Sequence, residues 1–386
     1  MKYDAVVVGA GPAGSMTALS ILREDPEKKV LLVDKRKELG RPVQCAGGIV
    51  KDRLDLLDLP DLPEEVIAQP CRGAVLHGPG GAEAVWDGGR TRGYVMHRDR
   101  FDQWLAALAC EAGAELRRED PACTDPPYDY RCRYLVGADG WRSQLGKRFF
   151  GKSIDLGIDY HTGVEYLVHL DEPHDTSFIH LYFGNYIAPG GYIWVFPESD
   201  HLVRVGCGVV PGLSARSFLN RFLDTGEWAG ERIGVSAGGI IPTSRPVACL
   251  HAEVMRPGGR YQRVALVGDA ARMTDPVHGG GIANAMEAAV ELGKVIAEDG
   301  ELLKYSIWFE KNMEKELERR YLLKKVMAKW NDSEMDAMVE VMSQLVIRDD
   351  VPVNELVRSM VLKLALKKPL MFPKALGNAL IAKFTS

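Results

Sequence analysis

Residues 1–15 read MKYDAVVVGAGPAGS, and this stretch decides the fold of the chain. The apolar run at 5–8 has the length and composition of a buried parallel strand. Gly9, Gly11 and Gly14 follow it with the spacing G-x-G-x-x-G. In that motif the first glycine permits a tight turn, the second lets the backbone approach a pyrophosphate, and the third lets a helix pack closely on the strand. The free N–H groups of such a helix face phosphates, so the stretch predicts a dinucleotide site.

The expected partner for a ribose comes next along the chain. A second apolar run, at 30–33, ends in Asp34. In dinucleotide-binding folds an acidic residue about 20 residues beyond the glycines accepts hydrogen bonds from a ribose hydroxyl. Glycine patterns alone arise by chance in turns, but the strand, glycines, helix and terminal acid occur together here, which favours the dinucleotide site.

Composition excludes several classes of protein. At 386 residues the chain is long for one core, so we expect two connected domains or a nucleotide domain with a large insertion. The net charge of −5 gives no support for nucleic-acid binding. The seven cysteines lack C-x-x-C pairs, so we expect no disulfide framework, no metal site and a reducing cytoplasm. We also expect no signal peptide and no transmembrane span, because no run of about 18 apolar residues occurs.

The order of strands and turns predicts how the chain is divided. Parallel-type strands separated by helices indicate a doubly wound sheet, whereas the alternating strands from about 152 to 248 indicate an antiparallel sheet. We expect an α/β fold, α+β overall, in which a Rossmann-like domain carries an inserted antiparallel sheet and C-terminal helices. The expected ranges are 1–72, 93–151 and 255–300 for the nucleotide domain, 73–92 and 152–254 for the inserted sheet, and 301–386 for the helices.

A later segment indicates which dinucleotide binds. The strand at 263–268 is followed by Asp269, and a glycine-rich loop then opens a helix at Ile282. A two-domain NAD dehydrogenase has no need of a late strand and glycine-rich loop that come back to the nucleotide domain. FAD has a ribityl chain that Asp269 could hold, and a helix N-terminus would stabilise the anionic reduced flavin. We therefore expect FAD, with a helix N-cap as the alternative role of Asp269.

The motifs resemble those of a known group of flavoproteins. VVVGAGPAGS, GADG at 137–140 and GDAARMTDPVHGGGIANAMEAA at 268–289 are similar to the group that includes aromatic hydroxylases of the p-hydroxybenzoate hydroxylase type. Within that group, PVQCAGG at 42–48 and GGYIWVFP at 190–197 resemble the geranylgeranyl reductase family, most closely the archaeal digeranylgeranylglycerophospholipid reductases. The resemblance spans nearly the whole chain.

The resemblance implies a set of FAD contacts. Arg98 would pair with a phosphate, with Arg100 as its alternative. Asp139 would lie near FAD and a pyridine nucleotide, or would simply cap a helix. The implied contacts are Ala13, Asp34, Cys45, Ala46, Gly48, Arg98, Ala122, Asp269, Gly281 and Ile282. Gly9, Gly11 and Gly14 of the glycine motif complete the expected cofactor site.

The implied reaction saturates isolated double bonds of isoprenoid chains on glycerophospholipids. Such an alkene needs a hydride from the reduced flavin and a proton from a donor, in a site that excludes water. A free thiol is mostly protonated at neutral pH, so Cys45 is the catalytic candidate, as proton donor or as a group that positions the flavin. Its alternative role is simple packing on the flavin. His278 is a lesser candidate donor, or a hydrogen-bonding loop histidine.

The strand at 191–197 is the candidate substrate wall. Side chains alternate along a strand, so Tyr192, Trp194 and Phe196 share a face and would line an apolar tunnel, although plain core is the alternative. Gly190 and Gly191 would let the isoprenoid approach the backbone.

The remaining expectations concern partners. An isoprenoid glycerolipid is the expected substrate, with electrons from ferredoxin, coenzyme F420 or NAD(P)H. The segment 361–386 has five lysines and no acid, which favours peripheral contact of a cytoplasmic protein with the inner membrane face, or else a solvated basic helical end. The rival functions are an NAD(P)H-dependent FAD monooxygenase or halogenase, and a non-catalytic prenyl-lipid carrier on the same fold.

Overall fold

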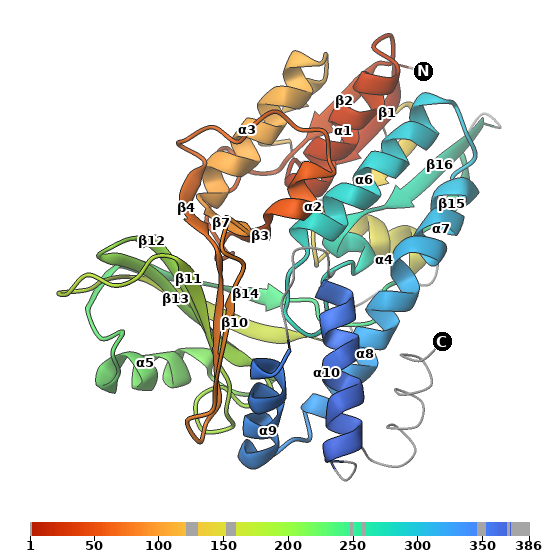
Figure 1. Ribbon diagram of the computed structural model, residues 1–386. Coiled ribbons are helices and arrows are strands. Elements are labelled where there is room, and N and C mark those ends of the chain that lie inside the picture. Colours follow the sequence, from red (N-terminus) through yellow and green to blue (C-terminus); the bar gives the residue numbers. More distant parts are fainter. Residues whose placement is uncertain are drawn as a thin grey trace.

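The computed structural model describes residues 2–120, 130–151, 160–247, 250–256, 260–345, 353–368 and 371. Among these residues the chain forms two large sheets and one small sheet with helices around them (Figure 1). This confirms the expected α/β fold with both parallel and antiparallel sheets. Ala122, Cys123, Cys249 and most of the segment 361–386 lie outside the described residues.

The first sheet has six strands in the order β15-β16-β9-β1-β2-β8. Their bounds are β1 Tyr3–Val8, β2 Val30–Val33, β8 Glu115–Arg117, β9 Cys132–Gly137, β15 His251–Arg256 and β16 Arg260–Leu266. All neighbours are parallel except β15 and β16. Parallel sheets are covered on both faces, and residues 5–8 and 30–33 are accordingly almost fully buried.

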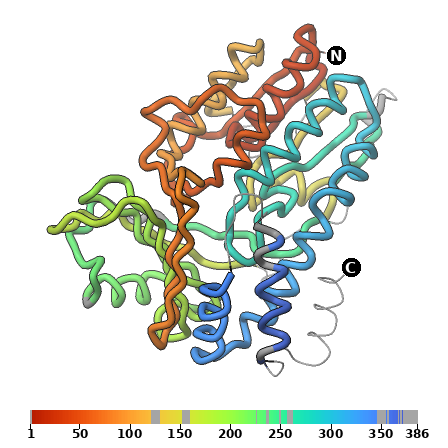
Figure 2. Tube along the Cα trace, in the orientation of Figure 1, coloured from red at the N-terminus to blue at the C-terminus, as the bar shows by residue number. Residues whose placement is uncertain are grey.

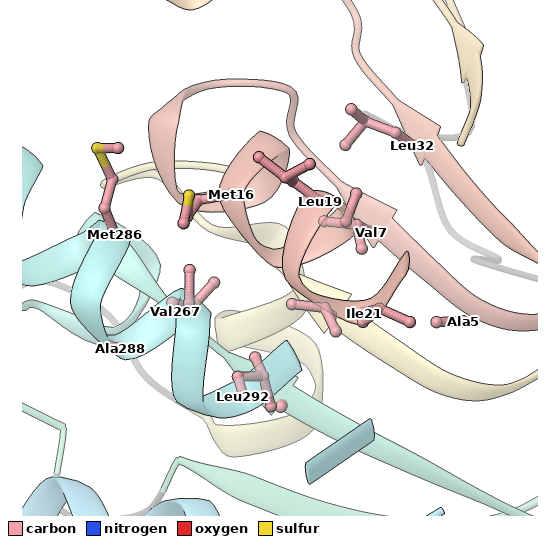
Figure 3. Packing of buried hydrophobic residues seen from close by; sticks show 14 of the residues in the cluster. Ala5, Val7, Met16, Leu19, Ile21, Leu32, Val267, Met286, Ala288 and Leu292 are labelled. Atoms are coloured by element: carbon pink, nitrogen blue, oxygen red, sulfur yellow. The ribbon is translucent and has the colours of Figure 1, made fainter. Parts of the chain in front are cut away.

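Two helices from distant parts of the chain pack together on this sheet. They are α1 (Pro12–Glu24) and α6 (Ile282–Ala297), whose buried side chains include Met16 and Met286 (Figure 3). A Cβ on Gly293 of α6 would lie 2.4 Å from a side-chain atom of α1, so this glycine allows the close approach of the two helices. The other helical elements here are α2 Lys51–Asp55, α3 Arg98–Glu111, α4 Gln144–Phe150 and a 3-10 turn at Gly268–Ala271.

The second sheet has seven strands in the order β14-β10-β13-β12-β11-β5-β6. The bounds are β5 Gly73–His77, β6 Glu83–Asp87, β10 His161–His169, β11 Phe178–Tyr182, β12 Tyr192–Ser199, β13 Leu202–Val209 and β14 Glu231–Ile241. Neighbours are antiparallel except β5 and β11, which are parallel. Helix α5 (Ala215–Thr225) packs on one face of this sheet, which leaves the other face for the site.

The structure corrects one expected boundary and adds one sheet. Residues 251–254 were expected in the inserted sheet, but they belong to β15, which pairs with β16 at the edge of the six-stranded sheet. The two strands pair antiparallel from His251 opposite Ala265 to Arg256 opposite Arg260. The additional sheet has the order β3-β7-β4, with bounds β3 Gly48–Val50, β4 Ile67–Cys71 and β7 Gly93–Met96.

The described part of the C-terminal region, residues 301–345 and 353–368, consists mainly of helices, as expected, and it packs on the hairpin β5–β6 (Figure 2). A buried cluster joins Leu76 and Ala84 of the hairpin to side chains of α8, α9 and α10. The bounds are α7 Leu303–Phe309, a π-helical turn Glu310–Glu314, α8 Lys315–Met327, α9 Asp332–Ser343 and α10 Val353–Lys367. Within the described part of the chain, no helix has the length and apolar character needed to cross a membrane.

Candidate functional site

The glycine motif forms a cradle whose open position is Gly11. Gly9 has a φ of +104°, and a Cβ there would lie 2.2 Å from the carbonyl oxygen of Ala138. A Cβ on Gly14 would lie 1.8 Å from the carbonyl oxygen of Gly9, whereas one on Gly11 would meet no described atom within 4 Å. No described side chain caps α1, so its first N–H groups can bind an anion. Backbone packing therefore requires Gly9 and Gly14, and Gly11 leaves space for a phosphate.

Asp34 is part of the same cradle. Its Oδ2 accepts a hydrogen bond of 2.8 Å from the Ala10 N–H, and its Oδ1 accepts one of 2.8 Å from the Arg36 N–H. Each carboxylate oxygen has a further lone pair, so Asp34 can still accept from a ribose hydroxyl. The position after β2 is therefore consistent with the role expected from the sequence.

The returning segment lies directly against the first cradle. A Cβ on Gly268 would lie 2.8 Å from the Cβ of Ala13, and a Cβ on Gly281 would lie 3.4 Å from Oδ1 of Asp269. Asp269 accepts a hydrogen bond of 2.7 Å from Thr274 Oγ1, and burial raises the pKa of its carboxyl group. Asp269 does not occupy the N-cap of either helical element next to it. No described side chain caps α6, so a second open helix N-terminus meets the site.

Arg98 links the start of α3 to the Cys45 loop. Its guanidinium group donates to Asp102 Oδ1 at 2.9 Å and also hydrogen-bonds to Cys45. Burial opposes the charge on Arg98, but Asp102 and Cys45 raise its pKa above the usual value. The charge of Arg98 also acts on Asp269. Arg100 instead donates to a backbone carbonyl at 2.9 Å, so Arg98 is the arginine placed at the predicted site.

The alternation predicted for β12 is confirmed. Ile193 and Val195 are buried in the core under α5. Tyr192, Trp194 and Phe196 alternate with them and are only half-buried. We call the face that carries these three residues the aromatic face; its partial exposure distinguishes it from the packed core on the opposite side of the sheet.

Trp194 lies flat across the neighbouring strand on this face. A Cβ on Gly206 would lie 2.1 Å from Trp194 Cζ2, so only glycine fits beneath the ring. The indole Nε1 is buried and has no hydrogen-bond partner among the described residues. Buried donors are normally satisfied, so this N–H marks a position where a ligand or water can accept a hydrogen bond.

The aromatic face also touches both loops expected to hold the flavin. A Cβ on Gly48 would lie 2.6 Å from Phe196 Cε2. The Tyr192 hydroxyl donates to the carbonyl oxygen of His278, and burial raises the pKa of Tyr192, with Asp275 and Cys45 adding to the effect. The candidate substrate wall and the candidate cofactor loops are thus in direct contact.

Some residues nominated from the sequence have local structural roles. Asp139 accepts a hydrogen bond of 2.7 Å from the Gln144 N–H and therefore caps α4. His278 accepts from the Gly280 N–H at 3.1 Å and lies 3.1 Å from Asp275 Oδ2, which are the contacts of a loop-structuring histidine.

Protein atoms occupy the space in which side chains at positions 190 and 191 would lie. Cβ atoms on these two glycines would lie 2.3 Å from Val210 Cγ1 and 2.0 Å from the Gly208 carbonyl oxygen, respectively. Packing against these neighbouring residues therefore accounts for the absence of a side chain at both positions.

Three charged residues near the aromatic face were missed by the sequence analysis. Arg204 lies 2.5 Å from Glu198 Oε1 and 3.5 Å from Glu165 Oε1. Both carboxylate side chains are almost fully buried. Charged residues that alternate with apolar ones along a strand predict a side that faces solvent. Only the pairing of β13 with β10 and β12 could have indicated that these three residues lie near Trp194.

A hydrogen-bond chain joins α8 to the end of the seven-stranded sheet. Lys324 Nζ donates to Thr243 Oγ1 at 2.7 Å, and His161 Nδ1 lies 2.8 Å from the same oxygen. His161 Nε2 lies 2.9 Å from the carbonyl oxygen of Gly190. Because a carbonyl only accepts, Nε2 carries the proton and Nδ1 accepts from the threonine hydroxyl. Burial, and then Lys324, lower the pKa of His161 to about 4.

The hydrogen bonds of His161 predict that the folded protein loses stability in mild acid. The pKa of His161 is depressed from 6.5 to about 4, so its stabilising contribution is complete above pH 6.5 and is lost as the pH falls toward 4. The free energy of unfolding should fall by up to about 1.4 kcal/mol per pH unit in this window. Thermal unfolding at several pH values should show a shallower slope for His161→Gln, whereas the turn variant His201→Gln should keep the wild-type slope. Equal slopes for wild type and His161→Gln would contradict the prediction.

The geometry fits a flavin dinucleotide. The two uncapped helix N-termini, the open space at Gly11 and the acceptors Asp34 and Asp269 match the needs of pyrophosphate, ribose and ribityl groups. The cofactor candidates that are half-buried, as expected for the lining of a cleft, are Gly9, Gly11, Ala13, Cys45, Ala46, Arg98, Asp269, Gly281 and Ile282.

Comparison with known proteins gives the family. Residues 159–240 match the family model of the geranylgeranyl reductase catalytic domain. A digeranylgeranylglycerophospholipid reductase from Methanothrix thermoacetophila is 33% identical over 374 residues, which are 88% of this chain and 91% of that protein. A reductase of the same name from Thermoplasma volcanium is 31% identical, over 89% of this chain and 92% of that protein.

Solved structures agree with this assignment. A geranylgeranyl bacteriochlorophyll reductase-like protein from Thermoplasma acidophilum superposes with a TM-score of 0.81 at 28% identity, covering 96% of this chain and 97% of the other. A halogenase PltM mutant in complex with FAD has a TM-score of 0.64 at 13% identity, covering 100% and 95%; this likeness concerns the fold alone. The chain therefore belongs to the geranylgeranyl reductase family.

Proposed function

We propose that this protein is an FAD-dependent oxidoreductase that saturates the C=C double bonds of geranylgeranyl chains in archaeal membrane glycerophospholipid precursors. The observation that carries the proposal is the contact between Phe196 on the aromatic face and Gly48 in the Cys45 loop. That contact brings an apolar wall of half-buried aromatic rings to the loop that would hold the reactive part of the flavin. An isoprenoid chain lying on this wall would have its double bonds beside that loop.

The proposed division of roles follows the geometry. The cradle around Gly9, Gly11 and Gly14, with Ala13 and Asp34, binds the dinucleotide half of FAD. Bound FAD, once reduced, supplies the hydride. Asp269, Gly281 and Ile282 hold the other half, and Arg98 fixes the Cys45 loop beside it. The further proposed contacts are Ala46 and Gly48, and Ala122 outside the described residues.

Cys45 is the proposed proton donor to the second alkene carbon. It is a free, half-buried cysteine, and Arg98 and Arg204 both interact with it. The two guanidinium groups would stabilise the charge left on sulfur after proton transfer. Tyr192, Trp194 and Phe196 would bind the chain and exclude water from the developing positive charge.

The proposal extends to partners and location. The substrate is an isoprenoid glycerolipid, and the electron donor is a ferredoxin, coenzyme F420 or NAD(P)H. We also propose that the protein is cytoplasmic and meets the inner membrane face peripherally, where the lysine-rich end of the chain would be attracted to anionic lipid.

An anaerobic single-turnover experiment tests the reductase function. The dithionite-reduced holoenzyme is mixed with digeranylgeranylglycerophospholipid in detergent, flavin reoxidation is followed by visible absorbance, and mass spectrometry counts the hydrogens gained by the lipid. Reoxidation with a gain of two hydrogens per flavin supports the proposal. A flavin that stays reduced until oxygen is admitted would overturn it in favour of a monooxygenase or halogenase.

Replacing a residue of the aromatic face should weaken lipid binding selectively. Trp194→Phe removes part of an apolar surface that would contact the isoprenoid, so the KM for lipid should rise about fivefold while flavin content stays unchanged. The matched variant Trp86→Phe alters a half-buried tryptophan of the hairpin, whose Nε1 donates to the Met342 carbonyl, and should leave the KM unchanged. Steady-state kinetics of both variants would check this, and equal shifts in KM would contradict the assigned role of the aromatic face.

A further inference from the structure

A buried carboxyl group lies on the aromatic face, one strand away from Trp194. Glu165 of β10 is directly opposite Gly206 of β13, and Gly206 is directly opposite Trp194 of β12. Residues opposite each other in neighbouring strands point to the same face. Since Gly206 has no side chain, nothing from the strand between them separates Glu165 from the space around the indole ring.

Glu165 shares its charged neighbours with Cys45. Arg204 Nη1 lies 3.5 Å from Glu165 Oε1, and the charges of both Arg204 and Arg98 act on this carboxyl group. The same two arginines interact with Cys45. The loop itself lies beside β10, because Gln44 Nε2 donates to the Gly238 carbonyl oxygen at 3.1 Å, and Gly238 and Ala237 of β14 are directly opposite Val164 and Glu165.

The surroundings of Glu165 favour a proton that can be gained and lost near neutral pH. Burial raises the pKa of Glu165 to about 6; Arg204 and Arg98 act to lower it, and Glu198 acts to raise it. Glu198 has a further neighbour, His97, whose Nδ1 lies 3.9 Å from Glu198 Oε2 and whose side chain is 29% exposed. A side chain that is part-way to solvent thus adjoins the buried pair of carboxyl groups.

We propose that Glu165 is the proton reservoir that restores the Cys45 thiol between successive double-bond reductions, an inference that rests on the proposed reductase function. Each reduction consumes one hydride from the reduced cofactor and one proton from the thiol, and two C–H bonds replace the π bond. The proton of the Glu165 carboxyl then passes to the Cys45 thiolate, which leaves a carboxylate paired with Arg204. Water returns the proton to Glu165 before the next reduction.

Reprotonation of Cys45 requires a proton donor other than the two arginines. Arginine stays protonated in proteins, so Arg98 and Arg204 can stabilise charge on sulfur but cannot reprotonate it. A lipid chain on the aromatic face would cover the half-buried thiol and slow its direct reprotonation from solvent. The cluster of Glu165, Arg204 and Glu198 adjoins His97, which is 29% exposed and gives protons a route from solvent. Glu165 is therefore a positioned proton source, and it acts on the substrate only through Cys45.

The test compares the first turnover with steady-state turnover in the holoenzyme. In Glu165→Gln the first turnover does not depend on reprotonation of the thiol, so the first anaerobic flavin reoxidation should stay within about threefold of wild type. Steady-state reduction with excess dithionite should fall about tenfold or more, because each later cycle waits for a new proton. In wild type the steady-state rate should decline as the pH rises through about 6, and this decline should be absent in Glu165→Gln. Glu165→Asp keeps a carboxyl group, so its steady-state rate should lie between those of Glu165→Gln and wild type.

Glu198→Gln is the matched control, since Glu198 pairs with the same arginine. The Glu198 carboxylate raises the pKa of Glu165, so removing its charge should move the decline to lower pH without abolishing it. If Glu165→Gln lowers the first and the steady-state rates equally, or keeps the pH decline, Glu165 is only an ion-pair partner and the inference is wrong. If wild-type flavin is not reoxidised by lipid at all, the reductase function itself fails, which is a separate result.

Discussion

Changing Cys45 to serine should lower the single-turnover rate of lipid reduction by about a hundredfold to ten-thousandfold. Serine keeps the size of the side chain, but its hydroxyl is a far weaker acid than a thiol. The developing charge on the alkene would then lack a proton at the moment of hydride transfer. The rate of anaerobic flavin reoxidation by digeranylgeranylglycerophospholipid measures this effect directly.

Two further measurements separate proton donation from flavin positioning. Flavin content and the absorption spectrum should be unchanged in Cys45→Ser if the thiol only donates a proton. The matched variant Cys110→Ser alters another half-buried free cysteine, on α3, and should react at the wild-type rate. A Cys45→Ser protein that keeps the full rate would show that the proton comes from elsewhere in the site.

Adding one methyl group at Gly11 should abolish flavin binding without unfolding the protein. The backbone at Gly11 has a φ of −77°, and a Cβ there would meet no described atom within 4 Å. Alanine is therefore tolerated by the protein, but its methyl group fills the space that a pyrophosphate needs. We expect Gly11→Ala to be purified nearly colourless, with at least about a tenfold loss in flavin affinity, and with a Tm of the flavin-free protein close to wild type.

Gly14→Ala is the informative contrast. Its Cβ would lie 1.8 Å from the Gly9 carbonyl oxygen, so α1 must move away from β1. Overpacking of this kind costs about 1–3 kcal/mol of unfolding free energy or more. Thermal unfolding of the flavin-free proteins should therefore separate the two variants. Equal Tm values, or a yellow Gly11→Ala protein with normal flavin content, would contradict the assigned roles of the two glycines.

Local patterns predicted those parts of the site that depend on neighbours in sequence. The strand, glycines and acid from Tyr3 to Asp34 follow from spacing, because Gly9 and Gly14 are constrained by backbone atoms close in the chain or just after the adjacent strand β9, while Gly11 stays open for a phosphate. The outward face of β12 also follows from strict alternation, which the burial of Ile193 and Val195 confirms.

Long-range packing determined what the sequence analysis missed. Glu165 has the pattern of a solvent-facing residue in β10, and its burial follows from long-range contacts such as the pairing of β10 with β13, which brings Arg204 to its carboxyl group. The strand β3 is three residues long and begins in a glycine-rich segment, so local propensity favours a loop; pairing with β7 makes it a strand. The edge strand β15 was misplaced because its mixed polar and apolar residues fit either sheet.

The position of the hairpin β5–β6 has a consequence for biosynthesis. The Gly80 N–H donates to Asp336 Oδ1 at 2.9 Å, across a separation of 256 residues. Leu76 and Ala84 are covered by helices from the end of the chain. A nascent polypeptide thus carries this hairpin out of the ribosome with its apolar side uncovered through most of translation, and with the β5 edge unpaired until Phe178–Tyr182 of β11 has been made. Exposed edges of this kind template aggregation, so slow elongation before residue 330 would lower the yield of folded protein, even in a cell where the finished enzyme is stable.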